Sequence, residues 1–422
     1  MSTKLMNFLE SSYTAYHAVE NTRQFLLDRG FTPLLETEDW ALTENGRYFV
    51  AREGAILAFT IGNLDRFNFK IVASHTDSPA LKIKENAVQK TESYEKLNVE
   101  KYGGGIWYTF FDRPLKVAGR IITEENGLLK LNTVVSDYTL TIPSVAIHQN
   151  RGVNDGFAVN AQVDLSPLLA LQGGENNYLT ALSAGKIVES DLYLVAADMP
   201  YAFGLNDEFI ASPRIDNLTS VFASVLALAS HAPSQGICVA ACLDSEEIGS
   251  RTLAGADSDF LENTLRRITS ALKFDETEYF KALASSFCFS VDNAHAVHPN
   301  HPEKSDPTSR PVLGGGITIK KHACGAYTTD GVSSAVAKTI FERAGVKYQY
   351  FLNRSDVQSG STLGSLSLSH VGVKSVDIGL AQLAMHSANE CFAKKDFDEL
   401  VSGLTAYYSS DIVFNEEGIQ IL

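Results

Sequence analysis

Two adjacent carboxylates, Glu246 and Glu247, follow an apolar run at 237–243 and come just before Gly249. Four to eight apolar residues closed by polar and glycine positions are typical of a buried strand that leads into a loop. Paired carboxylates at such a point are costly to bury unless a cation holds them. The segment alone fits a solvated acidic loop or a helix N-terminus as well as it fits a cation site. Other segments of the chain are needed to choose between these interpretations.

The same pattern occurs three more times in the chain. Apolar runs within 67–77, 285–295 and 374–387 lead to His75 and Asp77, to Asp292 and to His386. Parallel strands place their binding residues at their carboxyl ends, so four such ends can converge on one site. Asp216 would join them from the entrance of an apolar helix at 217–230.

Imidazole and carboxylate groups are the ligands that zinc and other divalent metals take in proteins. The candidate ligands are His75, Asp216, Glu247, Asp292 and His386. A carboxylate such as Asp216 can bridge two ions roughly 3.5–4 Å apart, and a water held between such ions becomes a nucleophile. Glu246 is placed to take that proton, and Asp77 can accept the second ring N–H of His75. Spacing alone does not fix which ligands share an ion.

Elements of two kinds must position these side chains. At 422 residues, the chain exceeds one typical domain. From about residue 201, strands alternate with helices expected at 217–230, 258–272, 331–344 and 396–413. This alternation predicts an α/β fold with a mixed central sheet flanked by helices. One helix is also expected over 3–29, ahead of a β-meander.

The stretch 86–200 has a different composition, dense in β-branched and aromatic residues, with an Asn126-Gly127 hairpin signal. We therefore expect a β-rich domain at 86–200, inserted into a catalytic domain made of 1–85 and 201–422.

Composition excludes several classes of protein. The formal charge of 35 − 50 = −15 argues against nucleic-acid binding. Five cysteines with no CxxC pair are expected to be reduced thiols. No apolar span of 18 residues and no signal-peptide pattern occurs, so we expect no membrane partner and a cytoplasmic location.

Seven segments between about residues 70 and 390 form one series: SHTDSPALKIK, YGGGIWYTFFDRPLKVAGR, AIHQNRGVND, SPRIDNLTS, LDSEEIGS, SVDNAHAVHPN and MHSANE. In content and order they resemble the aspartyl aminopeptidase family of dizinc metallopeptidases. The resemblance implies two metal ions, with zinc expected and cobalt or manganese able to act in vitro. It implies that the five candidate ligands bind them, that Asp216 bridges, that Glu246 is the general base and that Asp77 supports His75.

The resemblance also implies self-association. The insert is expected to be a dimerisation domain, and the dimers are expected to build a tetrahedral homododecamer. His148 matches a family histidine that reaches a neighbouring subunit's site and stabilises the oxyanion. The residues alone favour a strand-end histidine with local hydrogen bonds.

The resemblance implies a peptide substrate with N-terminal Asp or Glu, and Lys320 matches a family lysine near the substrate side chain. The residues alone fit a solvated strand end for Lys320 equally well. The segment 357–369 departs from the family pattern around its GST triplet, so neutral or basic specificity stays open. A dizinc deacylase and a non-catalytic, metal-stabilised scaffold also stay open; the YGGGIW segment disfavours the first and Glu246 the second.

Overall fold

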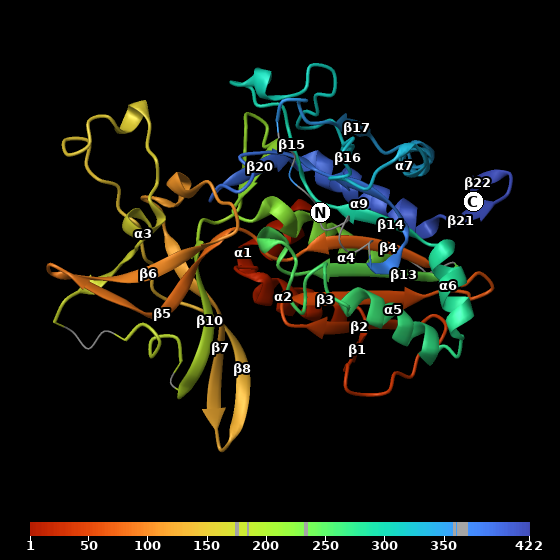
Figure 1. Ribbon diagram of the computed structural model, residues 1–422, viewed down its shortest axis with the longest axis horizontal. Helices are drawn as coiled ribbons and strands as arrows, with labels where there is room; N and C mark the ends of the chain where they lie inside the picture. The colour runs from red at the N-terminus through yellow and green to blue at the C-terminus, as the bar shows by residue number, and fades with distance from the viewer. Residues whose placement is uncertain (174–176, 184, 232–234, 358–359, 361–369) are drawn as a thin grey trace.

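The computed structural model describes residues 1–173, 177–183, 185–231, 235–357, 360 and 370–422, and within them two large sheets lie side by side (Figure 1). The larger sheet has nine strands in the order β1-β2-β3-β13-β4-β14-β18-β16-β17 among these residues. Its strands are β1 (Thr32–Leu34), β2 (Arg47–Arg52), β3 (Ala55–Ile61), β13 (Ile237–Leu243), β4 (Phe69–His75), β14 (Phe287–Val291), β18 (Lys374–Gly379), β16 (Ile317–Lys320) and β17 (Tyr348–Phe351). Strands β13, β4, β14 and β18 are neighbours and run parallel.

Helices cover both faces of the nine-stranded sheet. Side chains alternate across each strand, so a strand that is apolar throughout presents apolar side chains on both faces, and both must be buried. Along β13, Cys238 and Ala240 pack in one apolar cluster, and Val239 and Ala241 pack in another. The first cluster includes α1 (Ser2–Ser11), α2 (Ala15–Leu27), α4 (Ile215–Ser230), α7 (Gly331–Ala344) and α9 (Lys394–Ser409). The second includes α5 (Phe260–Ala271) and α6 (Glu276–Ala284). The predicted mixed α/β fold is confirmed.

The second sheet is antiparallel and has its own apolar core. In the described residues its order is β8 (Leu128–Val135), β7 (Leu115–Glu125), β10 (Ile187–Ala196), β5 (Ala80–Thr91), β6 (Tyr94–Tyr102) and β9 (Leu168–Leu171). The expected boundary between residues 85 and 86 falls inside β5. The sheet starts earlier because Ala80 already pairs with Tyr102.

Two smaller sheets complete the described strands. One has the order β11 (Tyr201–Phe203), β12 (Phe209–Ser212), β20 (Glu390–Ala393), β19 (Ala381–Leu383) and β15 (Ala294–His295). The other pairs β21 (Ile412–Asn415) with β22 (Gly418–Ile421), and α3 (Ala161–Asp164) is a short helix. No helix in the described ranges is both long and apolar enough to cross a bilayer.

Two expectations about elements were wrong, and one helix was not predicted. The single helix over 3–29 is two helices: α1 ends at Ser11 with Ser12 as its C-cap, and the extended backbone of Thr14 precedes α2. Serine and threonine favour such helix ends over helix interiors. The run before His386 is not one strand, because β18 ends at Gly379 and the chain passes into β19 of another sheet. Helix α6 was missed.

Candidate metal centre

Three of the predicted site segments leave the nine-stranded sheet at the same edge. His75 is the last residue of β4, Asp292 directly follows β14, and Glu247 lies in the short turn after β13. Because β13, β4 and β14 are parallel neighbours, their carboxyl ends bring these side chains together.

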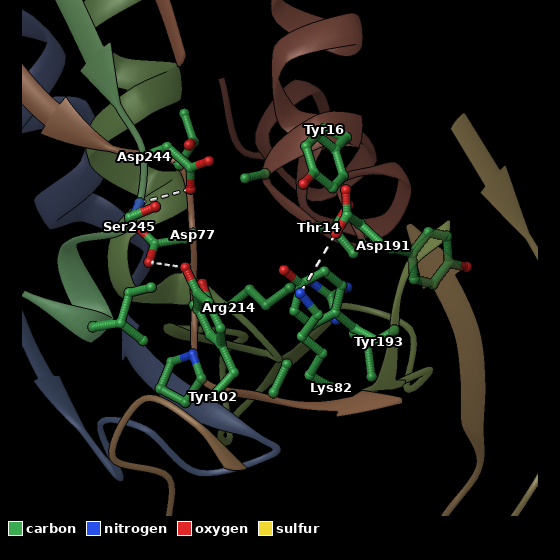
Figure 2. Close-up of a pocket in the computed structure, with 18 of the residues that line it drawn as sticks. Thr14, Tyr16, Asp77, Lys82, Tyr102, Asp191, Tyr193, Arg214, Asp244 and Ser245 are labelled. Atoms are coloured by element: carbon green, nitrogen blue, oxygen red, sulfur yellow. Dashed lines mark hydrogen bonds and ion pairs between the residues drawn. The ribbon is translucent and has the colours of Figure 1, made fainter. Parts of the chain in front are cut away.

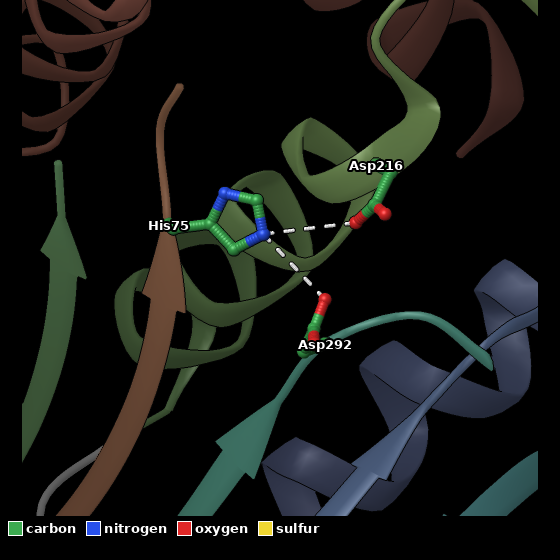
Figure 3. A group of neighbouring side chains, drawn as sticks. All are labelled: His75, Asp216 and Asp292. Atoms are coloured by element: carbon green, nitrogen blue, oxygen red, sulfur yellow. Dashed lines mark ion pairs between the residues drawn. The ribbon is translucent and has the colours of Figure 1, made fainter. Parts of the chain in front are cut away.

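His75, Asp216 and Asp292 form the first group, shown in Figure 3. The Nε2 atom of His75 lies 3.7 Å from Oδ1 of Asp216 and 3.5 Å from Oδ1 of Asp292. Its Nδ1 lies 3.1 Å from the carbonyl oxygen of Asp77, which can only accept, so Nδ1 carries the proton. Nε2 is thereby left to face the two carboxylates as a metal ligand would.

His386, Asp216 and Glu247 form the second group. The Nε2 atom of His386 lies 3.4 Å from Oδ2 of Asp216 and 3.3 Å from Oε1 of Glu247. The two oxygens of Asp216 therefore face two different histidines. His386 itself sits in the turn between β19 and β20, on a different sheet from His75.

The buried oxygens of this cluster fit a divalent metal. Oδ1 of Asp216 and Oε1 of Glu247 are buried and have no hydrogen-bond partner among the described residues. Within each group, the potential ligand atoms all lie within 4.8 Å of one another. Unpaired buried carboxylates are too costly without a cation, and mixed imidazole and carboxylate ligands suit zinc.

Asp77 organises the loop that carries the two glutamates. Its Oδ1 accepts the main-chain N–H of Glu246 at 3.0 Å, and its Oδ2 accepts that of Glu247 at 3.1 Å. Oδ1 also lies 3.3 Å from Nδ1 of His75. The side chain of Glu246 approaches His75 and Glu247, and burial together with the neighbouring carboxylates raises its pKa to about 7 in the metal-free protein.

Lys320 does not lie at a solvated strand end, which was one of the two settings that the sequence allowed. It is only 2 % exposed, and its ammonium donates to Oδ2 of Asp292 and to the Asn293 carbonyl, both at 3.1 Å. Although burial opposes ionisation, Lys320 and His75 hold the pKa of Asp292 well below its ordinary value. Solvation of Lys320 is thus excluded, and its substrate role stays a prediction.

His148 is not part of the cluster within this chain. It is exposed in a turn in which the Gln149 N–H donates to the Ala146 carbonyl, between β8 and β9 of the six-stranded sheet. A role in catalysis would therefore need a second subunit.

Sequence reasoning missed Glu390, a buried residue four positions after His386. Its Oε2 accepts the Asp216 N–H and its Oε1 accepts the His386 N–H. The residue lies within the MHSANE segment, but a carboxylate that binds main-chain groups leaves no periodic signal in a sequence.

A cavity of about 530 Å³ lies behind Asp77, between the two large sheets. Figure 2 shows residues that line it, with Tyr102 hydrogen-bonded to Asp77 and Tyr193 beside Lys82. The Tyr102 hydroxyl donates to Oδ2 of Asp77 at 2.9 Å. Tyr102 also escaped prediction, although it begins the YGGGIW segment.

A second cavity, of about 380 Å³, lies between the segments that follow Asp292 and precede His386. His295 lines it and is close enough to Asp216 and His386 to interact with them electrostatically. The segment 357–369, on which the sequence departs from the resembled family, lies almost wholly outside the described residues.

The sequence profile of one protein family, described as "Aminopeptidase I zinc metalloprotease (M18)", matches residues 8–408. The chain belongs to the M18 family. It is therefore a zinc metallo-aminopeptidase, a hydrolase of peptide bonds. The cluster described above is the part of this M18 chain whose residues fit the family's zinc.

Curated M18 relatives match the chain over nearly all of its length. A "Probable M18 family aminopeptidase 2" of Clostridium acetobutylicum is 41 % identical, covering 94 % of this chain and 97 % of the relative. A protein of the same name from Stutzerimonas stutzeri is 36 % identical, covering 96 % and 97 %.

Solved structures share the M18 fold. A chain in the "Cryo-EM structure of the Ape4 and Nbr1 complex" superposes with a TM-score of 0.91 at 33 % identity, covering 96 % of this chain and 85 % of that one. An M18 aminopeptidase from Thermotoga maritima has a TM-score of 0.85 at 23 % identity, covering 96 % and 95 %, and shows likeness of fold alone.

Proposed function

We propose that this M18 enzyme uses two zinc ions to remove single N-terminal residues from peptides. Asp216 supports the proposal most directly, because its two oxygens face two separate groups that each contain one histidine. One group would hold an ion through His75 and Asp292, and the other through Glu247 and His386. Asp216 would bridge the two ions.

Zinc bound in both groups would polarise the scissile carbonyl and lower the pKa of a water. Glu246 takes the proton from the attacking water as the oxygen bonds to the carbonyl carbon. The same proton then passes from Glu246 to the leaving amine as the peptide C–N bond breaks. Asp77 keeps His75 in the tautomer that leaves Nε2 free, through the Nδ1 hydrogen bond.

We propose that the preferred first residue is Asp or Glu. The 380 Å³ cavity beside the cluster supports this preference through two cationic lining residues, Lys304 and Arg354, of which Arg354 also pairs with Asp356. One acidic residue, Asp306, lines the cavity as well, and His295, His298 and His301 add imidazoles that can donate hydrogen bonds to a carboxylate. An acidic side chain entering the cavity would be attracted by this lining. Lys320 is the second candidate anchor, which the sequence predicts.

We further propose that the six-stranded sheet, together with its loops, mediates dimerisation and that dimers assemble into a tetrahedral homododecamer. One structural neighbour is described as a dodecamer, the mApe1 of yeast, at 24 % identity. The exposure of His148 on this part of the chain fits a residue that reaches a neighbouring subunit. There it would stabilise the oxyanion of the reaction.

Initial rates on peptides with N-terminal Asp, Glu, Leu and Lys test the proposal. Each would be measured on the purified enzyme, after chelation, and after adding back zinc, cobalt or manganese. Chelator-sensitive release of Asp or Glu supports the metal mechanism and the acidic preference. Release of Leu or Lys instead would discard the acidic preference. No release from any peptide, with metal bound, would favour a deacylase or a scaffold.

A further inference from the structure

The YGGGIW segment runs from the end of β6 into the metal cluster. Strand β6 ends at Tyr102, and the chain continues through Gly103 and Gly104 to Ile106. This segment, 102–106, extends from the six-stranded sheet, and three of its residues contact or approach the groups that would hold zinc. Each contact has a different chemical basis.

Tyr102 acts on the first group through Asp77. Its hydroxyl donates to Oδ2 of Asp77, the same oxygen that accepts the Glu247 N–H. Asp77 is 3 % exposed, so these few donors, rather than water, pair with its carboxylate oxygens. Removing the hydroxyl would loosen the carboxylate that orients His75 and the loop of Glu247.

Gly103 allows the segment to pass against Glu247. Its φ of +74° favours glycine, and a Cβ there would lie 3.1 Å from Cβ and 3.3 Å from Oε2 of Glu247. A side chain at this position would therefore push directly on a candidate ligand. Gly127, in the hairpin between β7 and β8, has a similar φ of +79° but no atom within 4 Å of a built Cβ.

His386 is held from two directions by the same segment. Its Nδ1 lies 3.1 Å from the Gly104 carbonyl, which fixes the proton on Nδ1 and leaves Nε2 for the cluster. Its own carbonyl accepts the Ile106 N–H at 2.9 Å. A Cβ added to Gly104 would lie 4.0 Å from Nδ1, which is an ordinary contact. The contribution of Gly104 is therefore its backbone carbonyl and not the absence of a side chain.

We propose that segment 102–106 is a positioning element that sets the geometry and affinity of the zinc site from the six-stranded sheet. Tyr102 fixes Asp77, Gly103 leaves room for Glu247, and the Gly104 carbonyl orients His386. This inference rests on the proposed dizinc function. It makes the second sheet part of the metal site within a single chain, in addition to any role in assembly.

Two pairs of variants test the proposal through zinc affinity, measured by competition with a chromogenic chelator. Tyr102→Phe removes one hydroxyl, and Tyr193→Phe is its control, because the Tyr193 ring packs on Tyr102 at 5.4 Å and its hydroxyl makes no hydrogen bond in the described part of the chain. Gly103→Ala adds the obstructing methyl. Gly127→Ala is its control, because it has the same backbone cost without a neighbour.

Tyr102→Phe and Gly103→Ala should each weaken zinc binding about tenfold or more, as is typical when a group that supports a ligand is lost. Their cobalt-substituted forms should show a changed visible absorption spectrum, which reports ligand geometry. Tyr193→Phe and Gly127→Ala should retain both properties. Thermal unfolding of the metal-free proteins separates a folding defect from a defect in the metal site.

The proposal is overturned if both test variants bind zinc as tightly as the parent with unchanged cobalt spectra. It is also overturned if Gly127→Ala loses as much affinity as Gly103→Ala. Should Gly103→Ala not fold, Tyr102→Phe decides the matter alone. A parent protein that binds zinc but releases no amino acid would contradict the proposed function and leave these comparisons valid.

Discussion

Glu390 holds Asp216 by its main chain: its Oε2 accepts the Asp216 N–H at 2.9 Å. The other oxygen accepts the His386 N–H at 2.5 Å. One buried carboxylate, 1 % exposed, therefore joins two candidate ligands that lie 170 residues apart in the sequence. Neither bond uses the side chain of Asp216 or His386, so both side chains remain free to bind the zinc ions proposed above.

Glu390→Gln should weaken zinc binding by roughly 10–100-fold. An amide has only one accepting oxygen and would leave one of the two N–H groups unpaired. Chelator competition measures the effect. Glu38→Gln, which changes an exposed glutamate, is the control, and equal affinities for the two variants would contradict the prediction.

Glu246→Gln should keep the bound metal while lowering kcat by about 10²–10⁴-fold, because the amide cannot accept a proton. Elemental analysis gives the metal content, and initial rates give kcat. Unchanged turnover would falsify the general-base role. Loss of metal would instead place Glu246 among the ligands.

Lys320→Met should destabilise the metal-free protein by about 3–5 kcal/mol, because Asp292 would be left as a buried charge without its cation. Urea unfolding measures this loss, with Lys321→Met as the neighbouring control. Kinetics of the same variant test the hypothesis, made from the sequence, that Lys320 lies near the substrate side chain. A KM that rises for Asp and Glu peptides but not for Leu peptides would assign Lys320 to the substrate pocket.

His148→Gln should lower kcat without removing metal and without dissociating the oligomer, because the side chain would act on the reaction of a neighbouring subunit. Size-exclusion chromatography, metal analysis and rates are measured on the same sample. Rates equal to those of the parent enzyme would leave His148 as a turn residue.

His231→Gln should reduce the sensitivity of folding to acid. Burial, with Lys70 and Arg47 nearby, lowers the pKa of His231 from 6.5 to about 4. Between these values the unfolded chain binds the extra proton, so His231 makes the free energy of unfolding fall as pH decreases, by up to about 1.4 kcal/mol per pH unit. Denaturant unfolding from pH 7 to 4 measures the slope.

The matched control is His301→Gln, which removes an exposed histidine. The prediction is contradicted if the slope of the His231→Gln protein equals that of the parent between pH 6.5 and 4.

The strand ends and their chemistry could be predicted from the sequence because they are local. An apolar run such as 237–243 is buried on both faces, and the polar residue that follows it must lie where the strand ends. His75, Glu247 and Asp292 were found in this way. The α/β class followed from the same alternation of runs.

The sequence did not reveal what lies between distant segments. Lys320 looked like a strand end open to solvent, and only packing against Asp292 buries it. Tyr102 and Glu390 act on main-chain groups or on another residue's carboxylate, and such contacts leave no periodic pattern. The sequence by itself indicated the kinds of candidate ligand and, for His75, Glu247 and Asp292, the strands that lead to them. The tertiary structure decided their partners, because hydrogen bonds across two sheets depend on distances that only the folded chain sets.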